Sequence, residues 1–208
     1  MTEANIRAQG GHIGLIVLAG PLLAGGAVAA VGWFSLTVWP PSMILVLMNW
    51  LAQVFVIVAG VCVAVALTGD PLIELHESTP TGFRSVQLIR AVLVAISGIA
   101  GAALMFFPLR AAGVWPHGEG WVSVLSPAGA VVIVAAVALF GAAFAGTASA
   151  TTIAVVAAWM FLALLWDPHV LSLPQQRALP LTVAALLFVA AWIRFGDAER
   201  NISKLAPV

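Results

Sequence analysis

The first third of the chain contains a long stretch without a charged side chain. No Lys, Arg, Asp or Glu occurs between Ile13 and Gly69. A helix needs about 20 mainly apolar residues to cross a bilayer, and the strongest break in this stretch is the Pro-Pro pair at 40–41, because two prolines interrupt a helix. The stretch therefore predicts two membrane spans.

The rest of the chain has the same character. Hydrophobic residues make up 62% of its 208 residues and charged residues only 8%, whereas roughly 25% of a soluble domain is charged. We expect an all-α polytopic integral membrane protein with about six transmembrane helices, in which residues 1–208 form a single transmembrane domain. The predicted spans cover about residues 13–39, 42–68, 86–107, 125–145, 149–166 and 179–195.

The N-terminal apolar run also has features of a signal peptide, because Arg7 precedes it and small residues follow in an A-x-A-like series. The run continues to Trp39, however, which is too long for the hydrophobic part of a signal peptide. Its length and its terminal tryptophan suit a tilted span. We therefore interpret it as the first membrane helix.

The basic residues predict the orientation, because Lys and Arg gather on the cytoplasmic side of a membrane protein. With the N-terminus inside, six basic residues lie in or next to the cytoplasm: Arg7, Arg84, Arg90, Arg194, Arg200 and Lys204. Only Arg110 and Arg177 are then outside. Both termini are expected to be cytoplasmic.

Several classes of function are disfavoured by what the sequence lacks. Net charge is zero and the basic residues are dispersed, so we expect no nucleic-acid partner. The single cysteine, Cys62, lies in an apolar run and provides no redox pair or thiolate metal site. A nucleotide-binding P-loop requires a lysine, and the only one is Lys204 near the C-terminus.

Polar residues within the spans are few. Asn49 and Gln53 are four residues apart, so they share one face of the second span. They could line a translocation path or form hydrogen bonds that hold neighbouring helices together. The span interiors carry no other ionisable residue than Arg90 near an end, which argues against a proton relay or an ion-coupled carrier.

The segment between the second and third spans predicts a short surface helix. An Asp-Pro pair at 70–71 suits a helix start, and the Ser-Thr-Pro sequence at 78–80 ends it. Its acidic and apolar side chains occupy different faces: Glu74 with Glu77, and Leu72 with Leu75. An ordinary solvated loop is the alternative.

The sequence LTGDPLIELHESTPTGFRSVQLIRA, in which the acidic helix and the Ser-Thr-Pro break are followed by Arg84 and Arg90, resembles the small six-span permease subunits of type-2 ABC exporters, particularly those of high-GC bacteria. In that family the first cytoplasmic loop carries a coupling helix that docks on the ATPase subunit. The resemblance implies that the ATPase-coupling residues are Leu72, Glu74, Leu75, His76, Glu77 and Arg84.

The resemblance also implies a location, partners and a division of labour. The chain would sit in the bacterial inner membrane as a transport subunit, without catalytic residues, metal or cofactor of its own. A separate ABC ATPase would bind ATP and Mg²⁺, and a second permease, identical or related, would complete the path. The proline-containing segment DPHVLSLPQQRALP would form short re-entrant helices on the outer side.

Scarcity of charge along the spans favours an amphipathic or lipid-like substrate, such as a natural product, a peptide or a lipid. Two other functions remain open. The chain could be an accessory or scaffold subunit of a larger membrane complex. It could also be a lipid-modifying enzyme that uses residues predicted to share the outer side, namely His117, Glu119, Asp167 and His169.

Overall fold

The computed structural model describes residues 14–68, 83–116, 120–170 and 172–196. These residues are mainly helical, and no strand occurs among them. Six helical segments are long and apolar enough to cross a membrane, which confirms the expected all-α fold with six spans. The elements are α2 (Leu15–Ser35), α3 (Pro41–Thr68), α5 (Phe83–Ala111), the 3-10 helix η1 (Gly120–Val124), α6 (Leu125–Phe144), α7 (Ala148–Met160), the π-helix η2 (Phe161–Trp166) and α8 (Leu173–Phe195).

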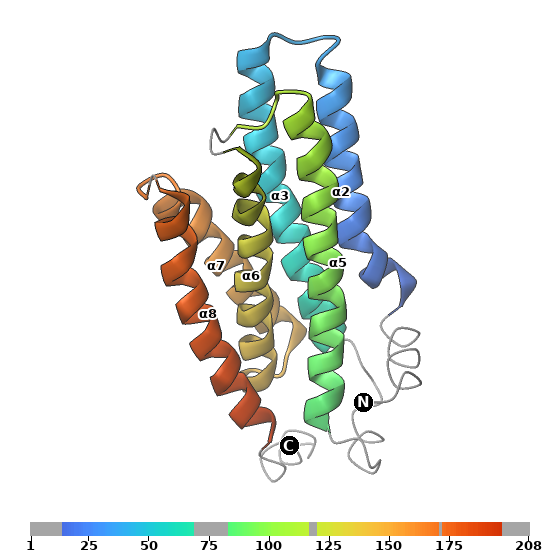
Figure 1. Cartoon of the computed structure of the whole chain (residues 1–208). Coiled ribbons are helices and arrows are strands. Elements are labelled where there is room, and N and C mark those ends of the chain that lie inside the picture. The colour runs from blue at the N-terminus through green and yellow to red at the C-terminus, as the bar shows by residue number, and fades with distance from the viewer. Residues whose placement is uncertain (1–13, 69–82, 117–119, 171, 197–208) are drawn as a thin grey trace.

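Helix α6 lies at the centre of the bundle. It packs against α3, α5, α7 and α8, while α2 lies on the far side and packs against α3 and α5 (Figure 1). The sequence of α6 is rich in Ala, Gly and Val, and most of its residues are buried. Small side chains on every face allow several neighbours to approach closely, as is usual for membrane helices.

The closest approach joins α2 to α5. A methyl group at Gly25 would overlap the backbone carbonyl of Gly101, and one at Gly101 would overlap the carbonyl of Pro21. The Ser97 hydroxyl of α5 also donates a hydrogen bond to the carbonyl of Leu18 in α2. These two helices therefore pack through backbone contact that only glycine permits.

The third predicted span ends too early. It stops at Phe107, in front of Pro108, whereas α5 continues to Ala111 with Pro108 inside its last turns. Pro108 cannot donate to the carbonyl of Leu104, so one backbone hydrogen bond is missing there, yet the helix continues past it to Ala111. Arg110 in the last turn also interacts favourably with the negative end of the helix dipole.

The sixth predicted span begins too late, and the described residues of 167–180 do not form the short re-entrant helices implied by the family resemblance. Residues 173–180 form the first turns of α8, which then continues without interruption to Phe195. Pro174 occupies the first turn, where a missing N–H costs no hydrogen bond. Arg177 therefore lies inside a helix rather than in an outer loop.

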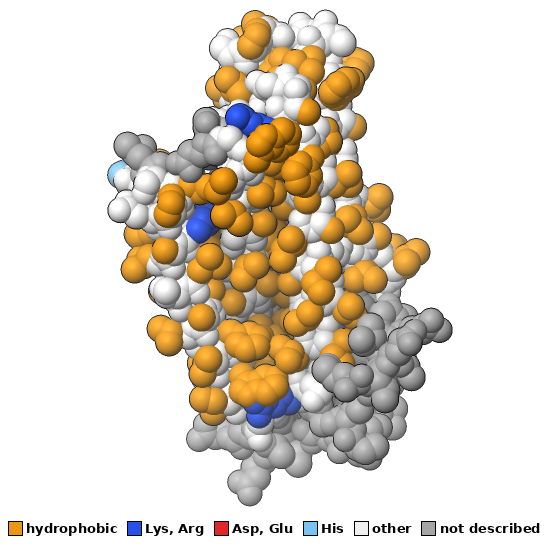
Figure 2. All heavy atoms as spheres, viewed as in Figure 1, with side chains coloured by type: hydrophobic (Ala, Val, Ile, Leu, Met, Phe, Trp, Pro, Cys, Tyr) orange, Lys and Arg blue, Asp and Glu red, His pale blue; other side chains and the backbone are white. Residues whose placement is uncertain are grey.

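The outer surface of the bundle is apolar. Large hydrophobic side chains cover it over most of its length, and the Lys and Arg side chains appear as a few separate positions (Figure 2). In a water-soluble protein this exposure would be a severe aggregation hazard. It suits a surface in contact with lipid.

Candidate functional site: a polar cavity between α3, α6, α7 and α8

An ion pair lies inside the bundle at the start of α8. Arg177 donates from Nη1 to Oδ1 of Asp167 at 2.7 Å and from Nη2 to Oδ2 at 2.9 Å. Its Nε and Nη2 also donate to the backbone carbonyl and the hydroxyl of Ser126, at 3.1 and 3.0 Å. The side chains of Arg177 and Asp167 are only 7% and 17% exposed. The bidentate geometry is the one that pairs a guanidinium most strongly with a carboxylate.

Local features of α6 and η2 place these groups together. On α6, Gly129 lies one turn after Ser126, and a methyl group there would come within 3.0 Å of Cδ of Arg177. Before Asp167, the π-helix Phe161–Trp166 inserts an extra residue into the turn, and the amide of Asp167 donates to the carbonyl five residues earlier. Such an insertion redirects the side chains that follow it and is frequent at functional sites.

The neighbouring Gln176 ties α8 to the end of η2. Its side-chain Nε2 donates to the backbone carbonyl of Asp167 at 2.9 Å. Its backbone carbonyl accepts a hydrogen bond from the indole N–H of Trp166 at 2.8 Å. In a regular helix that carbonyl would accept from residue 180, which is a proline and has no N–H. The indole thus replaces the hydrogen bond that Pro180 cannot make.

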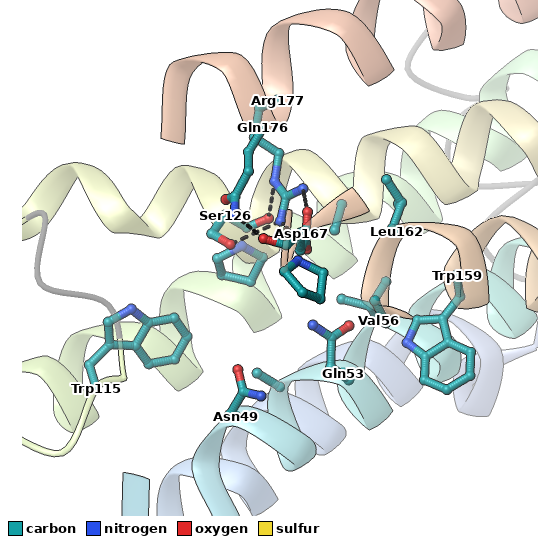
Figure 3. Close-up of a pocket in the computed structure, with 15 residues that line it drawn as sticks. Asn49, Gln53, Val56, Trp115, Ser126, Trp159, Leu162, Asp167, Gln176 and Arg177 are labelled. Carbon is teal, nitrogen blue, oxygen red and sulfur yellow. Dashed lines mark hydrogen bonds and ion pairs between the residues drawn. The ribbon is translucent and has the colours of Figure 1, made fainter. Parts of the chain in front are cut away.

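Next to the ion pair is a cavity of about 240 Å³. The polar groups lie on opposite walls, with Arg177 and Gln176 of α8 on one side and Asn49 and Gln53 of α3 on the other (Figure 3). The complete lining is Asn49, Ala52, Gln53, Val56, Trp115, Ser126, Pro127, Ala130, Trp159, Leu162, Ala163, Asp167, Pro168, Gln176 and Arg177.

The cavity offers neutral hydrogen-bonding groups rather than a net charge. Asp167 neutralises Arg177, so the pair contributes a dipole. Within the described part of the chain, the side chains of Asn49 and Gln53 form no hydrogen bond, and the indole nitrogen of Trp159 is buried without a partner. The two carboxamides can therefore bond to a molecule that enters the cavity.

The site residues predicted from the sequence fall into three groups. Asn49 and Gln53 line the cavity, although the expectation that they bond neighbouring helices finds no partner among the described residues. The proposed coupling residues Leu72, Glu74, Leu75, His76 and Glu77 lie outside the described residues. Arg84 is at the opposite end of the bundle from the cavity, over the ring of Trp192 on α8.

Of the residues considered for an enzyme, His117 and Glu119 also lie outside the described residues. Asp167 is held by Arg177, and His169 is exposed, with Nδ1 2.8 Å from the carbonyl of Leu165. Among the described residues, no cluster of three His, Cys, Asp or Glu side chains could bind a metal ion. Only Asp167 and His169 of the four are described, so the grouping of all four on one side stays a prediction.

The sequence reasoning missed the Asp167–Arg177 pair. It assigned both residues to an outer loop and concluded that the span interiors lacked ionisable groups beyond Arg90. The available signal was the opposite charges separated by ten residues around Pro174, together with Pro180 inside an otherwise helical pattern.

No family model, no curated protein and no solved structure matches the chain.

Proposed function

We propose that this chain is the membrane-spanning permease subunit of an ABC exporter, which moves an amphipathic or lipid-like molecule with ATP hydrolysed by a separate subunit. The observation that carries the proposal is the cavity of neutral hydrogen-bonding groups within a bundle of six mainly apolar helical segments. Polar groups within a membrane are costly and mark binding sites and pathways.

The chemistry of the cavity fits a molecule with both polar and apolar parts. Asn49 and Gln53 offer two carboxamides, and the Trp159 ring lies beside them in the lining. Trp115 and the aliphatic lining residues provide apolar contact beside them. Because the ion pair has no net charge, the cavity favours a neutral polar group over an ion.

The size of the cavity supports a pair of permeases. Sites for drug-sized ligands commonly have about 300–1,000 Å³, and about 240 Å³ in one chain accommodates only part of such a molecule. A second copy or a related permease that faced this cavity would enlarge it. We therefore propose a two-permease assembly.

The separation of the cavity from the proposed coupling region also supports an exporter. The cavity lies near the first turns of α8, whereas α3 ends and α5 begins at the other end of the bundle. The sequence between α3 and α5 carries the family-like segment with Glu74 and Glu77. An ATPase docked there would act on the cavity through the lengths of α3 and α5. We propose that ATP and Mg²⁺ bind to that partner and that this chain has no catalytic residue.

Co-purification tests the proposal. The tagged chain is isolated in mild detergent from its native membrane, its partners are identified by mass spectrometry, and the ATPase activity of the eluate is measured. We expect an ABC ATPase in the eluate and its loss from the variant Glu74→Lys with Glu77→Lys. A matched control reverses Asp197 and Glu199 of the C-terminal region and should retain the ATPase.

Two results would reject the proposal. Recovery of a stable complex without any ATPase would favour a scaffold subunit. Equal recovery of the ATPase from the Glu74/Glu77 variant and the control would show that the acidic segment is not the docking site.

A further inference from the structure

A second hollow lies on the outside of the bundle, between α5 and α8. It has a volume of about 420 Å³ and an almost wholly apolar lining, and α6 forms its floor with small residues such as Ala135 and Ala136. Figure 2 shows this face, with hydrophobic atoms along the hollow and basic side chains at its lower end. We call this hollow the α5–α8 groove.

The two walls of the groove are regular helix faces. On α5, Leu88, Ala91 and Ala95 follow one another at intervals of three or four residues, and the same holds for α8: Leu181, Ala185 and Phe188. One step further along these faces are Arg84 on α5 and Trp192 on α8. The guanidinium carbon of Arg84 lies 3.2 Å from the centroid of the Trp192 ring. The cation and the indole therefore close the end of the groove.

Arg84 has no anionic partner in the described part of the chain. Its Nε is buried without a hydrogen bond, and its guanidinium lies over the Trp192 ring. A cation–π contact leaves the in-plane N–H groups of a guanidinium available. Trp192 lies near the end of α8, at the level where tryptophans contact the polar surface of a bilayer.

We propose that the α5–α8 groove binds one anionic phospholipid, with its phosphate at Arg84 and one acyl chain along the groove. The apolar lining and the open side facing the membrane suit an acyl chain, and the Arg84 guanidinium, which has no carboxylate partner among the described residues, suits the phosphate. Basic pockets between membrane helices bind anionic head groups in this way. The proposal does not depend on the transport function.

Native mass spectrometry of the full chain tests this inference. The protein is purified in detergent and offered phosphatidylglycerol or phosphatidylcholine, and the bound lipid is counted. We expect one phosphatidylglycerol to be retained in preference to phosphatidylcholine. Arg84→Gln should weaken its retention about fivefold, the equivalent of roughly 1 kcal/mol for one guanidinium near the head groups. Arg84→Lys should keep most of the binding, because it keeps the charge.

A second pair of variants tests the acyl-chain site. Ala185 is exposed and lines the groove, so Ala185→Phe fills it without disturbing the core. Leu186 is the next residue, is 70% exposed and does not line the groove, so Leu186→Phe is the matched control. We expect Ala185→Phe to lose the lipid and Leu186→Phe to keep it.

Three outcomes would overturn the inference. Equal retention of the two lipids would show that the site does not recognise an anionic head group. Equal retention of phosphatidylglycerol by the Ala185 and Leu186 variants would show that the acyl chain does not lie in the groove. Dissociation of a dimer on Ala185→Phe would show that a second copy of the chain occupies the groove. Because none of these measurements involves an ATPase, they fail or succeed independently of the proposed transport function.

Discussion

Arg177 and Asp167 are ten residues apart in the chain and form two hydrogen bonds, of 2.7 and 2.9 Å, across the connection between η2 and α8. Ser126 of α6 accepts two further bonds from the same guanidinium. The pair therefore holds the beginning of α8 against both α6 and η2. It also forms one wall of the cavity.

Removing either charge of this pair should destabilise the bundle. Asp167→Asn leaves the guanidinium of Arg177 buried without its counter-ion, and Arg177→Gln does the same to the carboxylate. Loss of one partner from a buried pair typically costs about 3–5 kcal/mol. We expect each single variant to lower the free energy of unfolding by about 3 kcal/mol, measured by denaturant titration in detergent.

The double variant Asp167→Asn with Arg177→Gln should cost clearly less than the sum of the two single changes, since no unpaired charge remains. Arg110→Gln is the matched control, because Arg110 forms no ion pair with another described residue and should change stability by less than about 0.5 kcal/mol. Additive single effects would show that the two charges are not coupled.

Trp166 and Pro180 should also be coupled through the carbonyl of Gln176. Trp166→Phe removes the indole donor and leaves that carbonyl unpaired, which should cost about 1–3 kcal/mol. Pro180→Ala supplies a backbone N–H four residues after Gln176, so Trp166→Phe should cost much less in the Pro180→Ala background. Trp121→Phe, at a position 59% exposed, is the control for loss of an indole. Equal costs in the two backgrounds would contradict this account of the carbonyl.

Two adjacent glycines of α2 should respond differently to the same substitution. Gly25→Ala places a methyl group against the backbone of Gly101, which cannot move aside as a flexible side chain can, so we expect a loss of about 1–3 kcal/mol. Gly26→Ala places it at an ordinary contact distance, 3.5 Å from Cδ2 of Leu104, and should be neutral or slightly stabilising. Equal thermal stability of the two variants would show that α2 and α5 do not pack through Gly25.

The parts of the fold that could be predicted from sequence are those set locally. Length and apolar composition decide whether a segment can span a membrane, so six spans follow directly. The end of α6 could also be predicted, because a glycine and a threonine follow it at 146–147. In the structure Gly146 has a positive φ of 70°, and the Thr147 side chain accepts a hydrogen bond from the amide of Ala150. Both residue types are typical of a turn followed by a helix start.

The parts that sequence could not give depend on distant partners. Pro180 indicates a helix break unless another donor satisfies the carbonyl of Gln176. The indole N–H of Trp166 does so from a different helix. Likewise, the sequence places Arg177 in an outer loop, whereas the structure shows that α8 begins at Leu173 and includes Arg177. Gly25 and Gly101 are not distinctive in a chain with 19 glycines. Asn49 and Gln53 could be identified as candidate lining residues, since their spacing alone places them on one helix face.

The central claim is that ATP bound by a partner changes access to the cavity. The chain has a single cysteine, so a Cys62→Ala background allows one reporter thiol to be placed at will. Gln53→Cys puts that thiol on the cavity wall, and Thr37→Cys puts the control thiol at the exposed connection between α2 and α3. Each variant is co-purified with its ATPase and reconstituted into vesicles.

The decisive measurement is the rate at which a membrane-impermeant maleimide modifies the thiol at position 53, without nucleotide and with a non-hydrolysable ATP analogue. Alternating access predicts that this rate changes several-fold between the two conditions while the rate at position 37 stays constant. An unchanged rate at position 53, in a complex whose ATPase remains active, would contradict the proposal that this cavity belongs to an ATP-driven translocation path.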